Sequence, residues 1–193
     1  MDAARYYVAL FLVAFAPGIF LFWFSIHPFI RFWRRLGPLI TLTLHYALIL
    51  LLAAGVFLAR APLLSIEFGT HPVLVALAAL LLACGIVLRW KVSRRFSIKL
   101  LTGLPELAPA TYGKRLVTDS IYARIRHPRY VEIAVAFLAC ALFSNYLAAY
   151  AVFLLTLVWI VLVVRVEEKE LLARFGDEYA RYCARVPRFI PKF

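Results

Sequence analysis

Two short charged runs hold the side chains best suited to chemistry. The first is RIRHPRY at residues 124–130, and the second is RVEE at residues 165–168. Each lies at the edge of a long apolar stretch, where burying a polar group is expensive unless the group is paired or used. If the chain folds back between the two runs, a cationic strip with an imidazole and a phenol would face two carboxylates, as a zwitterionic ligand requires. The candidate residues of this site are Arg126, His127, Tyr130, Arg165, Glu167 and Glu168.

The sequence alone leaves a purely structural alternative open. Arginines at a membrane boundary commonly extend their charged ends into water as anchors, with Glu167 and Glu168 as their partners and the His127–Pro128 step as a helix cap. Glu132, one turn into the apolar stretch, must be paired, protonated or functional. Arg129, three residues earlier, could pair with it on one helix face. Structural and functional roles are therefore both open for Glu132.

The composition places these residues in a membrane protein. Hydrophobic residues make up 65% of the 193 and charged residues 17%, with a formal net charge of +12. A soluble domain is about half apolar and about a quarter charged, so this class is excluded. Nucleic acid is excluded as a partner because apolar runs of membrane-spanning length separate the cations. The four histidines are too scattered for a metal site, and His45 is expected to hydrogen-bond a neighbouring helix.

Four apolar runs set the predicted architecture. Tyr6–Phe29, Pro38–Ala59 and His71–Trp90 each have the roughly 20 residues that cross a bilayer core. The fourth run, Val131–Val164, would be about 50 Å long as one helix, which exceeds the core. Because the Ser144–Asn145 step favours a turn, we predict a reversal there. The predicted fold is an all-α polytopic membrane protein of one domain with five transmembrane segments, the last two a helical hairpin.

Charge predicts the orientation of these segments. With the N-terminus outside, only Arg5 and Arg60 lie outside, and the other twenty Lys and Arg residues are cytoplasmic, as the positive-inside rule requires. The cytoplasmic side then holds a loop over residues 91–129 and the tail from Arg165. Apolar residues recur in that tail at spacings of three and four, which predicts a C-terminal amphipathic helix. The preference for Arg over Lys and the richness in Ala and Leu favour a bacterial inner membrane.

Two segments together resemble a known family. GKRLVTDSIY at residues 113–122, followed by RHPRY at 126–130, resembles the entry motif of the isoprenylcysteine carboxyl methyltransferase family. EEKELLARFGDEYARYCARVPRFIP at residues 167–191 resembles its C-terminal signature, and the wider group includes phospholipid N-methyltransferases. Ser120 replaces the usual glycine, which is tolerable if its φ is negative. Glu132 replaces the small residue often found two positions after the motif tyrosine, which places a carboxylate near the expected point of methyl transfer.

The resemblance implies an integral-membrane methyltransferase that binds S-adenosylmethionine without a Rossmann domain. Residues 91–193 would supply the cofactor-binding loop, the hairpin and the terminal helix, and residues 1–90 the three N-terminal helices. The glutamates would hold the ammonium end of the cofactor, and Arg126 or Arg165 could meet its carboxylate. The implied cofactor-binding residues are Tyr122, His127, Tyr130, Glu167 and Glu168.

The implied acceptor is a lipid or a lipid-linked group that enters from the bilayer. A carboxylate acceptor needs only cations to place it, and the available ones are Arg126, Arg129 and Arg165. An amine acceptor must lose a proton, which requires a base such as Glu132 or His127. Two other classes remain: an NADPH-dependent reductase of sterol- or isoprenoid-like lipids, which shares an RHPxY-type end, and a non-catalytic membrane protein.

Overall fold

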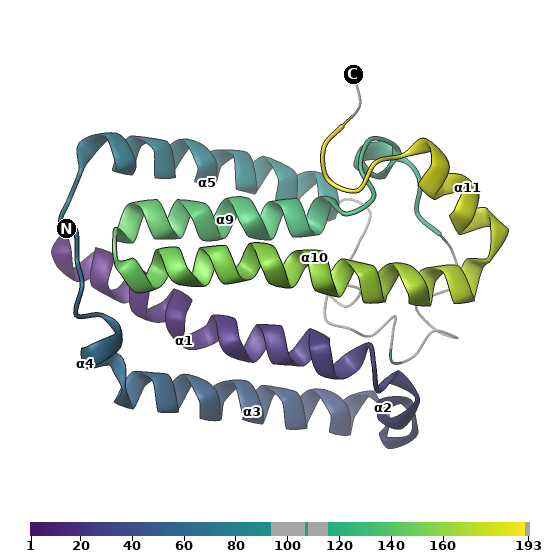
Figure 1. Ribbon diagram of the computed structural model, residues 1–193, viewed down its shortest axis with the longest axis horizontal. Coiled ribbons are helices and arrows are strands. Elements are labelled where there is room, and N and C mark those ends of the chain that lie inside the picture. The colour runs from purple at the N-terminus through teal and green to yellow at the C-terminus, as the bar shows by residue number, and fades with distance from the viewer. Residues whose placement is uncertain (94–106, 108–115, 192–193) are drawn as a thin grey trace.

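The computed structural model describes residues 1–93, 107 and 116–191 (Figure 1). Over these residues the secondary structure is helical, apart from an isolated β-bridge between Glu67 and Tyr146. The predicted all-α class is confirmed for this part of the chain. Five long helices form the bundle: α1 (Asp2–Ile26), α3 (Pro38–Leu58), α5 (Pro72–Ser93), α9 (Pro128–Ser144) and α10 (Leu147–Phe175).

Short helices lie at the two ends of the bundle (Figure 1). The predicted loop over residues 91–129 falls largely outside the described residues, and its described part includes a single 3-10 turn. The tail helix expected from Arg165 is continuous with α10, and Gly176, with a φ of +54°, separates it from the last helix. The short elements are α2 (Ile30–Leu36), α4 (Arg60–Leu63), η1 (Ser120–Ala123) and α11 (Asp177–Arg185).

Four of the long helices, α1, α3, α5 and α10, are long and apolar enough to cross a membrane. Helix α9 has 17 residues, which corresponds to about 26 Å at the helical rise per residue. That length falls short of a hydrocarbon core of about 30 Å. The membrane-protein class therefore rests on four helices, and a fifth crossing stays a prediction.

The chain reverses direction between α9 and α10. Helix α9 ends at Ser144, and Asn145 adopts the left-handed conformation with a φ of 56° and a ψ of 44°. Asparagine is one of the few residues with a side chain that tolerates this conformation. Helix α10 then begins at Leu147 and runs back beside α9 (Figure 1). The crossing of a bilayer by both arms remains a prediction.

A buried arginine ties the N-terminus to this reversal. The side chain of Arg5 is 1% exposed, and its Nη1 lies 2.7 Å from Oε1 of Glu67. Its Nε donates to the carbonyl of Ser144 at 3.1 Å, while Tyr146 Oη donates to Glu67 at 3.0 Å. Charge-assisted hydrogen bonds of this kind are the stronger ones. Residues from α1, the α4–α5 connection and the α9–α10 turn are thus held by one guanidinium.

Helices α1 and α3 pack closely at two positions. A side chain at Gly18 would overlap Ile49, since an added Cβ would lie 2.8 Å from its Cγ1. Further along, Ser25 Oγ and His45 Nε2 are 2.9 Å apart. The predicted hydrogen bond from His45 to a neighbouring helix is therefore confirmed.

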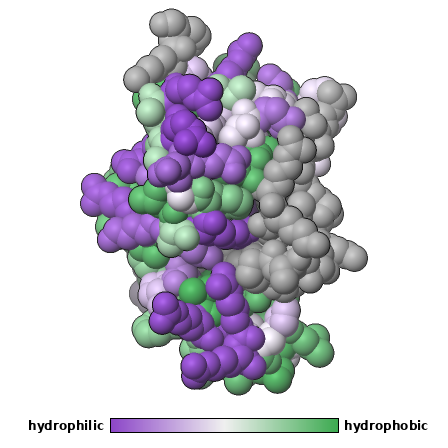
Figure 2. All heavy atoms as spheres, turned by 90° about the vertical axis from the view of Figure 1, so that its right-hand side faces the viewer, coloured by the Kyte–Doolittle hydropathy of each residue, from purple (hydrophilic) through white to green (hydrophobic). Residues whose placement is uncertain are grey.

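Cations gather at one end of the bundle. Arg5 and Arg60 lie at the end with the N-terminus and α4, whereas α2, α11 and the start of α9 lie at the other (Figure 1). Viewed from that second end, the surface is rich in hydrophilic side chains (Figure 2). Its exposed arginines include Arg31, Arg34, Arg35, Arg124, Arg181 and Arg185.

Replacing Arg5 by methionine tests the first of these ends. We expect the loss of about 3 kcal/mol of stability, the lower limit for a broken buried pair, because Glu67 is 37% exposed and partly rehydrated. The thermal midpoint in detergent should fall by roughly 6–12 °C. Arg60→Met is the matched control, since the interactions of the Arg60 side chain with described residues are confined to Phe57, through its carbonyl and its ring. Equal midpoints for the two variants would contradict this account.

Candidate active site

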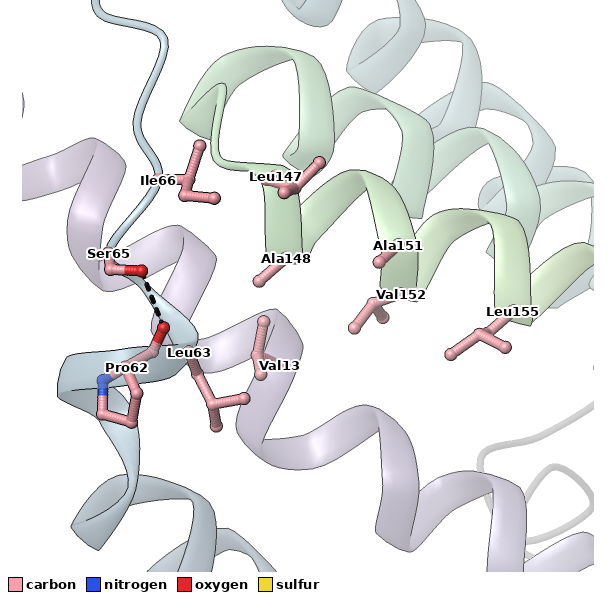
Figure 3. Close-up of a pocket in the computed structure, with 10 residues that line it drawn as sticks. All are labelled: Val13, Pro62, Leu63, Ser65, Ile66, Leu147, Ala148, Ala151, Val152 and Leu155. Atoms are coloured by element: carbon pink, nitrogen blue, oxygen red, sulfur yellow. Dashed lines mark hydrogen bonds between the residues drawn. The ribbon is translucent and has the colours of Figure 1, made fainter.

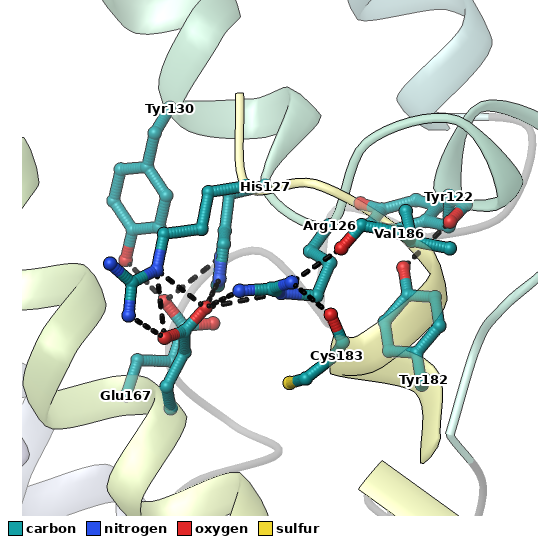
Figure 4. A network of polar contacts seen from close by, with 10 residues as sticks. Tyr122, Arg126, His127, Tyr130, Glu167, Tyr182, Cys183 and Val186 are labelled. Atoms are coloured by element: carbon teal, nitrogen blue, oxygen red, sulfur yellow. Dashed lines mark hydrogen bonds and ion pairs between the residues drawn. The ribbon is translucent and has the colours of Figure 1, made fainter. Parts of the chain in front are cut away.

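Five of the six polar residues predicted to act together meet at the cationic end of the bundle, and Arg165 does not join them (Figure 4). There the chain enters α9, and the segment after α11 returns to cross it. The backbone N–H of Arg126 donates to the carbonyl of Pro187 at 2.9 Å, and that of His127 to Arg188 at 3.0 Å. These two bonds fix the C-terminal segment against the entry to α9. The predicted juxtaposition of the two charged runs is also present, since Arg126 and His127 of the first run bond Glu168 of the second.

Glu168 is the centre of the network. Its side chain is 12% exposed and accepts hydrogen bonds from Arg126 Nη2 at 2.8 Å and His127 Nε2 at 3.1 Å. Arg188 donates Nη2 to the second oxygen at 2.6 Å and Nε at 3.0 Å. A carboxylate offers about four lone-pair sites. The protein's own donors therefore occupy almost all of the hydrogen-bonding sites of the Glu168 carboxylate.

Arg126 connects three parts of the chain. Besides Glu168, it donates Nη1 to the carbonyls of Cys183, at 3.0 Å, and Val186. These carbonyls lie at the C-terminal end of α11, where helical carbonyls lack partners within the helix. Binding of a ligand carboxylate by Arg126 stays a prediction, because most of the N–H donors of this residue bond to the protein itself.

Glu167 differs from its neighbour. One oxygen accepts a hydrogen bond from Tyr130 Oη at 2.7 Å, and His127 Nδ1 lies 4.0 Å from the same oxygen. The side chain is 24% exposed. Successive residues of a helix point about 100° apart, so Glu167 and Glu168 face different sides of α10. Glu167 consequently keeps acceptor capacity that Glu168 has lost.

Aromatic rings surround the Glu167 side of the network. Tyr130 is 5% exposed, and its ring centroid lies 5.9 Å from that of Trp159 and 5.8 Å from that of His127. The ring of Phe189, in the C-terminal segment, lies 6.1 Å from His127. This side therefore combines a carboxylate with π faces, which attract cations.

Tyr122, predicted for the cofactor pocket, lies on the other side of Arg126 (Figure 4). Its carbonyl accepts a hydrogen bond from Tyr182 Oη at 2.6 Å. Burial raises the pKa of Tyr182 to about 12, so the phenol stays protonated and remains a donor. Burial also raises the pKa of the Tyr122 phenol, on which the charges of Arg129 and Glu167 act with opposite signs. Its contact with a ligand stays a prediction.

Arg165 and Glu132 lie outside the network. Arg165 is exposed on α10, and no hydrogen bond or ion pair joins it to another described residue. Glu132 forms an ion pair with Arg89 of α5 at 3.7 Å. Residues two apart on a helix point to nearly opposite sides, so Glu132 faces α5 while Tyr130 faces α10. Catalytic roles for both stay predictions, and the structure separates Glu132, whose role the sequence left open, from the network around Glu168.

Ser120 departs from expectation. Serine was expected to replace glycine without strain if its φ were negative, but the φ is +57°. The position therefore keeps the left-handed conformation that glycine adopts without strain. A residue with a Cβ adopts it at a cost of about 1–2 kcal/mol. The condition for an easy replacement is therefore not met, because residues 119–124 lead into α9 with Ser120 in the left-handed conformation.

The contacts of several residues at this end were not predicted from the sequence. Arg188 lies in the predicted C-terminal signature, but nothing in its spacing links it to Glu168. His27 and Glu170, whose Nδ1 and Oε2 are 3.0 Å apart, are 143 residues apart in the chain. No sequence signal pairs residues at such separations without a homologous alignment.

A separate apolar groove lies at the far end, between α1, the α4–α5 connection and the start of α10 (Figure 3). Its volume is about 360 Å³. The lining has no titratable side chain, so it offers no acid, base or charge for catalysis. Its residues are Val13, Pro62, Leu63, Ser65, Ile66, Leu147, Ala148, Ala151, Val152 and Leu155.

Comparison with known proteins identifies the family. The model of the phospholipid methyltransferase family matches residues 73–178, more than half of the chain. The chain belongs to the phospholipid methyltransferase family. The match covers α5, α9, α10 and the start of α11, and thus both charged runs; α1 to α4 and Arg188 lie outside it. The resemblance inferred from the sequence motifs is confirmed.

Two curated relatives support membership of the phospholipid methyltransferase family. Methanethiol S-methyltransferase 1 of Bradyrhizobium diazoefficiens is 34% identical over 96 residues, which is 47% of this chain and 33% of the relative. Protein-S-isoprenylcysteine O-methyltransferase of Schizosaccharomyces pombe is 38% identical over 78 residues, 39% of this chain and 33% of the relative. The matches thus span about a third of each relative. No solved structure matches the chain. None of these findings supports the reductase alternative.

Ser120→Gly should stabilise the protein, because glycine removes the left-handed strain. We expect a gain of about 1 kcal/mol, or roughly 2–4 °C in the thermal midpoint in detergent. Ser120→Ala keeps the strain and serves as the control for the lost hydroxyl. A midpoint for the glycine variant at or below that of the alanine variant would contradict the strain.

Arg126→Gln should loosen the C-terminal segment, because it removes the donors to Glu168 and to the end of α11. We expect amide exchange over residues 177–191 to accelerate at least tenfold, equivalent to a loss of about 1.4 kcal/mol of local stability. Arg185→Gln is the control, since Arg185 bonds a carbonyl of its own helix. Unchanged exchange in the Arg126 variant would show that the segment is held elsewhere.

Proposed function

We propose that this family member is a membrane-embedded methyltransferase that uses S-adenosylmethionine and acts on a lipid or lipid-linked acceptor. The observation that carries the proposal is the partly free Glu167 carboxylate beside the rings of Tyr130 and His127, in a chain of a methyltransferase family. A carboxylate next to π faces suits a ligand with an ammonium group and a sulfonium.

The chemistry of the methyl donor fits the residues present. Glu167 would hold the ammonium, and the rings of Tyr130 and Phe189 would flank the sulfonium or the adenine. Glu168 instead serves as the anchor for Arg126, His127 and Arg188, because its lone pairs are already in use. Arg188, whose side chain is 48% exposed, and Arg165 are the cations available to the donor carboxylate.

When bound, the donor supplies an electrophilic methyl group. Transfer of such a group depends mainly on placing the nucleophile and on excluding water. The protein's own contribution is therefore positional. The His127–Glu168 hydrogen bond orients the imidazole, and the Tyr130–Glu167 hydrogen bond orients the carboxylate.

The acceptor belongs to the membrane in this proposal. Apolar helices would admit an amphipathic molecule sideways from the bilayer, while the donor would reach the cationic end from the cytoplasm. An isoprenylcysteine-type carboxylate and a phospholipid amine are the two acceptors we infer. The Bradyrhizobium relative, a methanethiol S-methyltransferase by name, adds a thiol as a third class. The positive-inside rule places the cationic end in the cytoplasm, consistent with a bacterial inner membrane.

Calorimetric titration with S-adenosylmethionine or its demethylated product tests the donor site. We expect Glu167→Gln and His127→Ala each to weaken binding at least tenfold, because one removes the charge opposite the ammonium and the other an adjacent ring. Glu178→Gln is the matched control, since Glu178 is exposed at the same end of the molecule. Retained affinity in both site variants would reject the assignment, and selective binding of NADPH would reject the methyltransferase.

A further inference from the structure

The short helix α2 lies where the bundle meets the membrane surface. It connects α1, which ends at Ile26, to α3, which begins at Pro38, and both of these helices are long and apolar enough to cross a membrane. Figure 1 shows α2 at the shared end of the two helices. A short connection between two such helices stays at the level of the lipid headgroups. Helix α2 also lies outside residues 73–178, which match the family.

The residues of α2 are divided between a basic side and an apolar side. Successive residues of a helix point about 100° apart, so the three arginines fall within an arc of about 100°. The opposite arc carries only apolar residues. An amphipathic helix with arginines on one side and aromatic residues on the other typically lies in the plane of the membrane interface. The arginines are Arg31, Arg34 and Arg35, and the apolar residues are Ile30, Phe32, Trp33 and Leu36.

Contacts with α1 and α3 fix the rotation of α2. Trp33 points inward, and its Nε1 donates to the carbonyl of Ser25 at 3.0 Å. The hydroxyl of Thr41 donates to the carbonyl of Trp33 at 3.1 Å. With Trp33 held in this way, the ring of Phe32 remains 54% exposed, and that of Phe29, just before the helix, is 63% exposed. Aromatic rings in this position are typical of the boundary between headgroups and hydrocarbon.

The basic side of α2 has two cations without a counter-charge among the described residues. Arg34 bonds Glu170 at 3.3 Å, whereas Arg31 and Arg35 are exposed and form no hydrogen bond or ion pair with a described residue. They are four residues apart, a spacing at which like charges destabilise a helix. Arg31 is also in the first turn, where the helix dipole disfavours a cation. Residues 3–66 contain no Asp or Glu, so the neighbouring sequence supplies no partner.

We propose that Arg31 and Arg35 bind the phosphate of an anionic phospholipid in the leaflet at the cationic end, with the Phe32 ring against its acyl chains. A phosphate between the two guanidiniums would accept charge-assisted hydrogen bonds from both and remove their repulsion. Phe32 points about 60° away from Arg35 and about 100° away from Arg31, so one lipid beside α2 can meet all three side chains. The exposed ring favours a lipid over a free phosphate ion, and the site does not depend on methyl transfer.

Helix α11 offers a matched pair of arginines at the same end. Arg181 and Arg185 are also four residues apart and exposed. Their helix, however, carries Asp177 and Glu178 in its first turn, and Arg185 donates Nε to the carbonyl of Arg181 at 3.3 Å. Helix α11 does not connect two apolar helices of membrane-spanning length. The two pairs thus share spacing and charge but differ in counter-charge and in position relative to the membrane.

Lipid titration of the full-length, delipidated protein in detergent, followed by native mass spectrometry, tests the proposal. The probes are phosphatidylglycerol and phosphatidylcholine with identical chains. We expect phosphatidylglycerol to bind more tightly. The double variant Arg31→Gln/Arg35→Gln should weaken its binding about fivefold for each arginine, or roughly 25-fold in all. The double variant Arg181→Gln/Arg185→Gln is the control, in which the affinity should stay within about twofold of that of the wild type.

Amide exchange provides a second readout, which uses the wild-type protein and does not require the variants to fold. Phosphatidylglycerol should slow exchange over residues 30–36 about tenfold and leave residues 177–185 unchanged. Neither phosphatidylcholine nor inorganic phosphate at the same concentration should have this effect. Phe32→Ser should reduce the protection by phosphatidylglycerol, because a lipid contacts the ring and a free phosphate would not.

Four outcomes would overturn the inference. Equal losses of affinity in the two double variants would indicate diffuse attraction to the whole cationic end, and equal binding of the two lipids would remove the role of charge. Protection of residues 30–36 by inorganic phosphate alone would indicate a site for a free ion. Protection that grows with protein concentration in the absence of lipid would indicate a contact between two copies of the chain. None of these outcomes affects the donor site, which is tested separately.

Discussion

The buried carboxylate of Glu168 is the contact on which the cationic end of the molecule depends. Three donors, from Arg126, His127 and Arg188, converge on it from the entry to α9 and from the C-terminal segment. Each of these groups alone would be costly at the edge of a membrane, and together they satisfy one another. Because Arg126 also holds the end of α11, the same carboxylate fixes the position of the tail.

Because the protein's own donors surround Glu168, the neighbouring Glu167 keeps carboxylate lone pairs that can accept further hydrogen bonds. The two adjacent glutamates point about 100° apart on α10, so one is enclosed by donors while the other faces aromatic rings. The proposed binding of a zwitterion would need both kinds of group: a fixed framework and a carboxylate with free lone pairs. The buried Arg5 performs a comparable structural task at the opposite end, where it joins α1 to the α9–α10 turn.

Helices outside the family match also reach this end of the molecule. Helices α5, α9 and α10 carry the residues that the motifs identify, whereas α1 contributes Trp23 and His27. In the proposed function, the motif-bearing helices would hold the methyl donor, and the remaining helices would border the acceptor.

The sequence by itself determined the membrane class, the all-α fold of the described residues and the reversal at Ser144–Asn145. It also predicted that Arg126, His127, Tyr130, Glu167 and Glu168 lie together. Hydropathy, turn preference and motif spacing are local properties, so they can be read along the chain. Only the tertiary structure decided that Glu168 is enclosed while Glu167 is partly free, that Glu132 turns toward Arg89, and that Ser120 takes a positive φ. It also paired His27 with Glu170. These outcomes depend on helix rotation and on contacts between residues up to 143 positions apart, which no local pattern encodes.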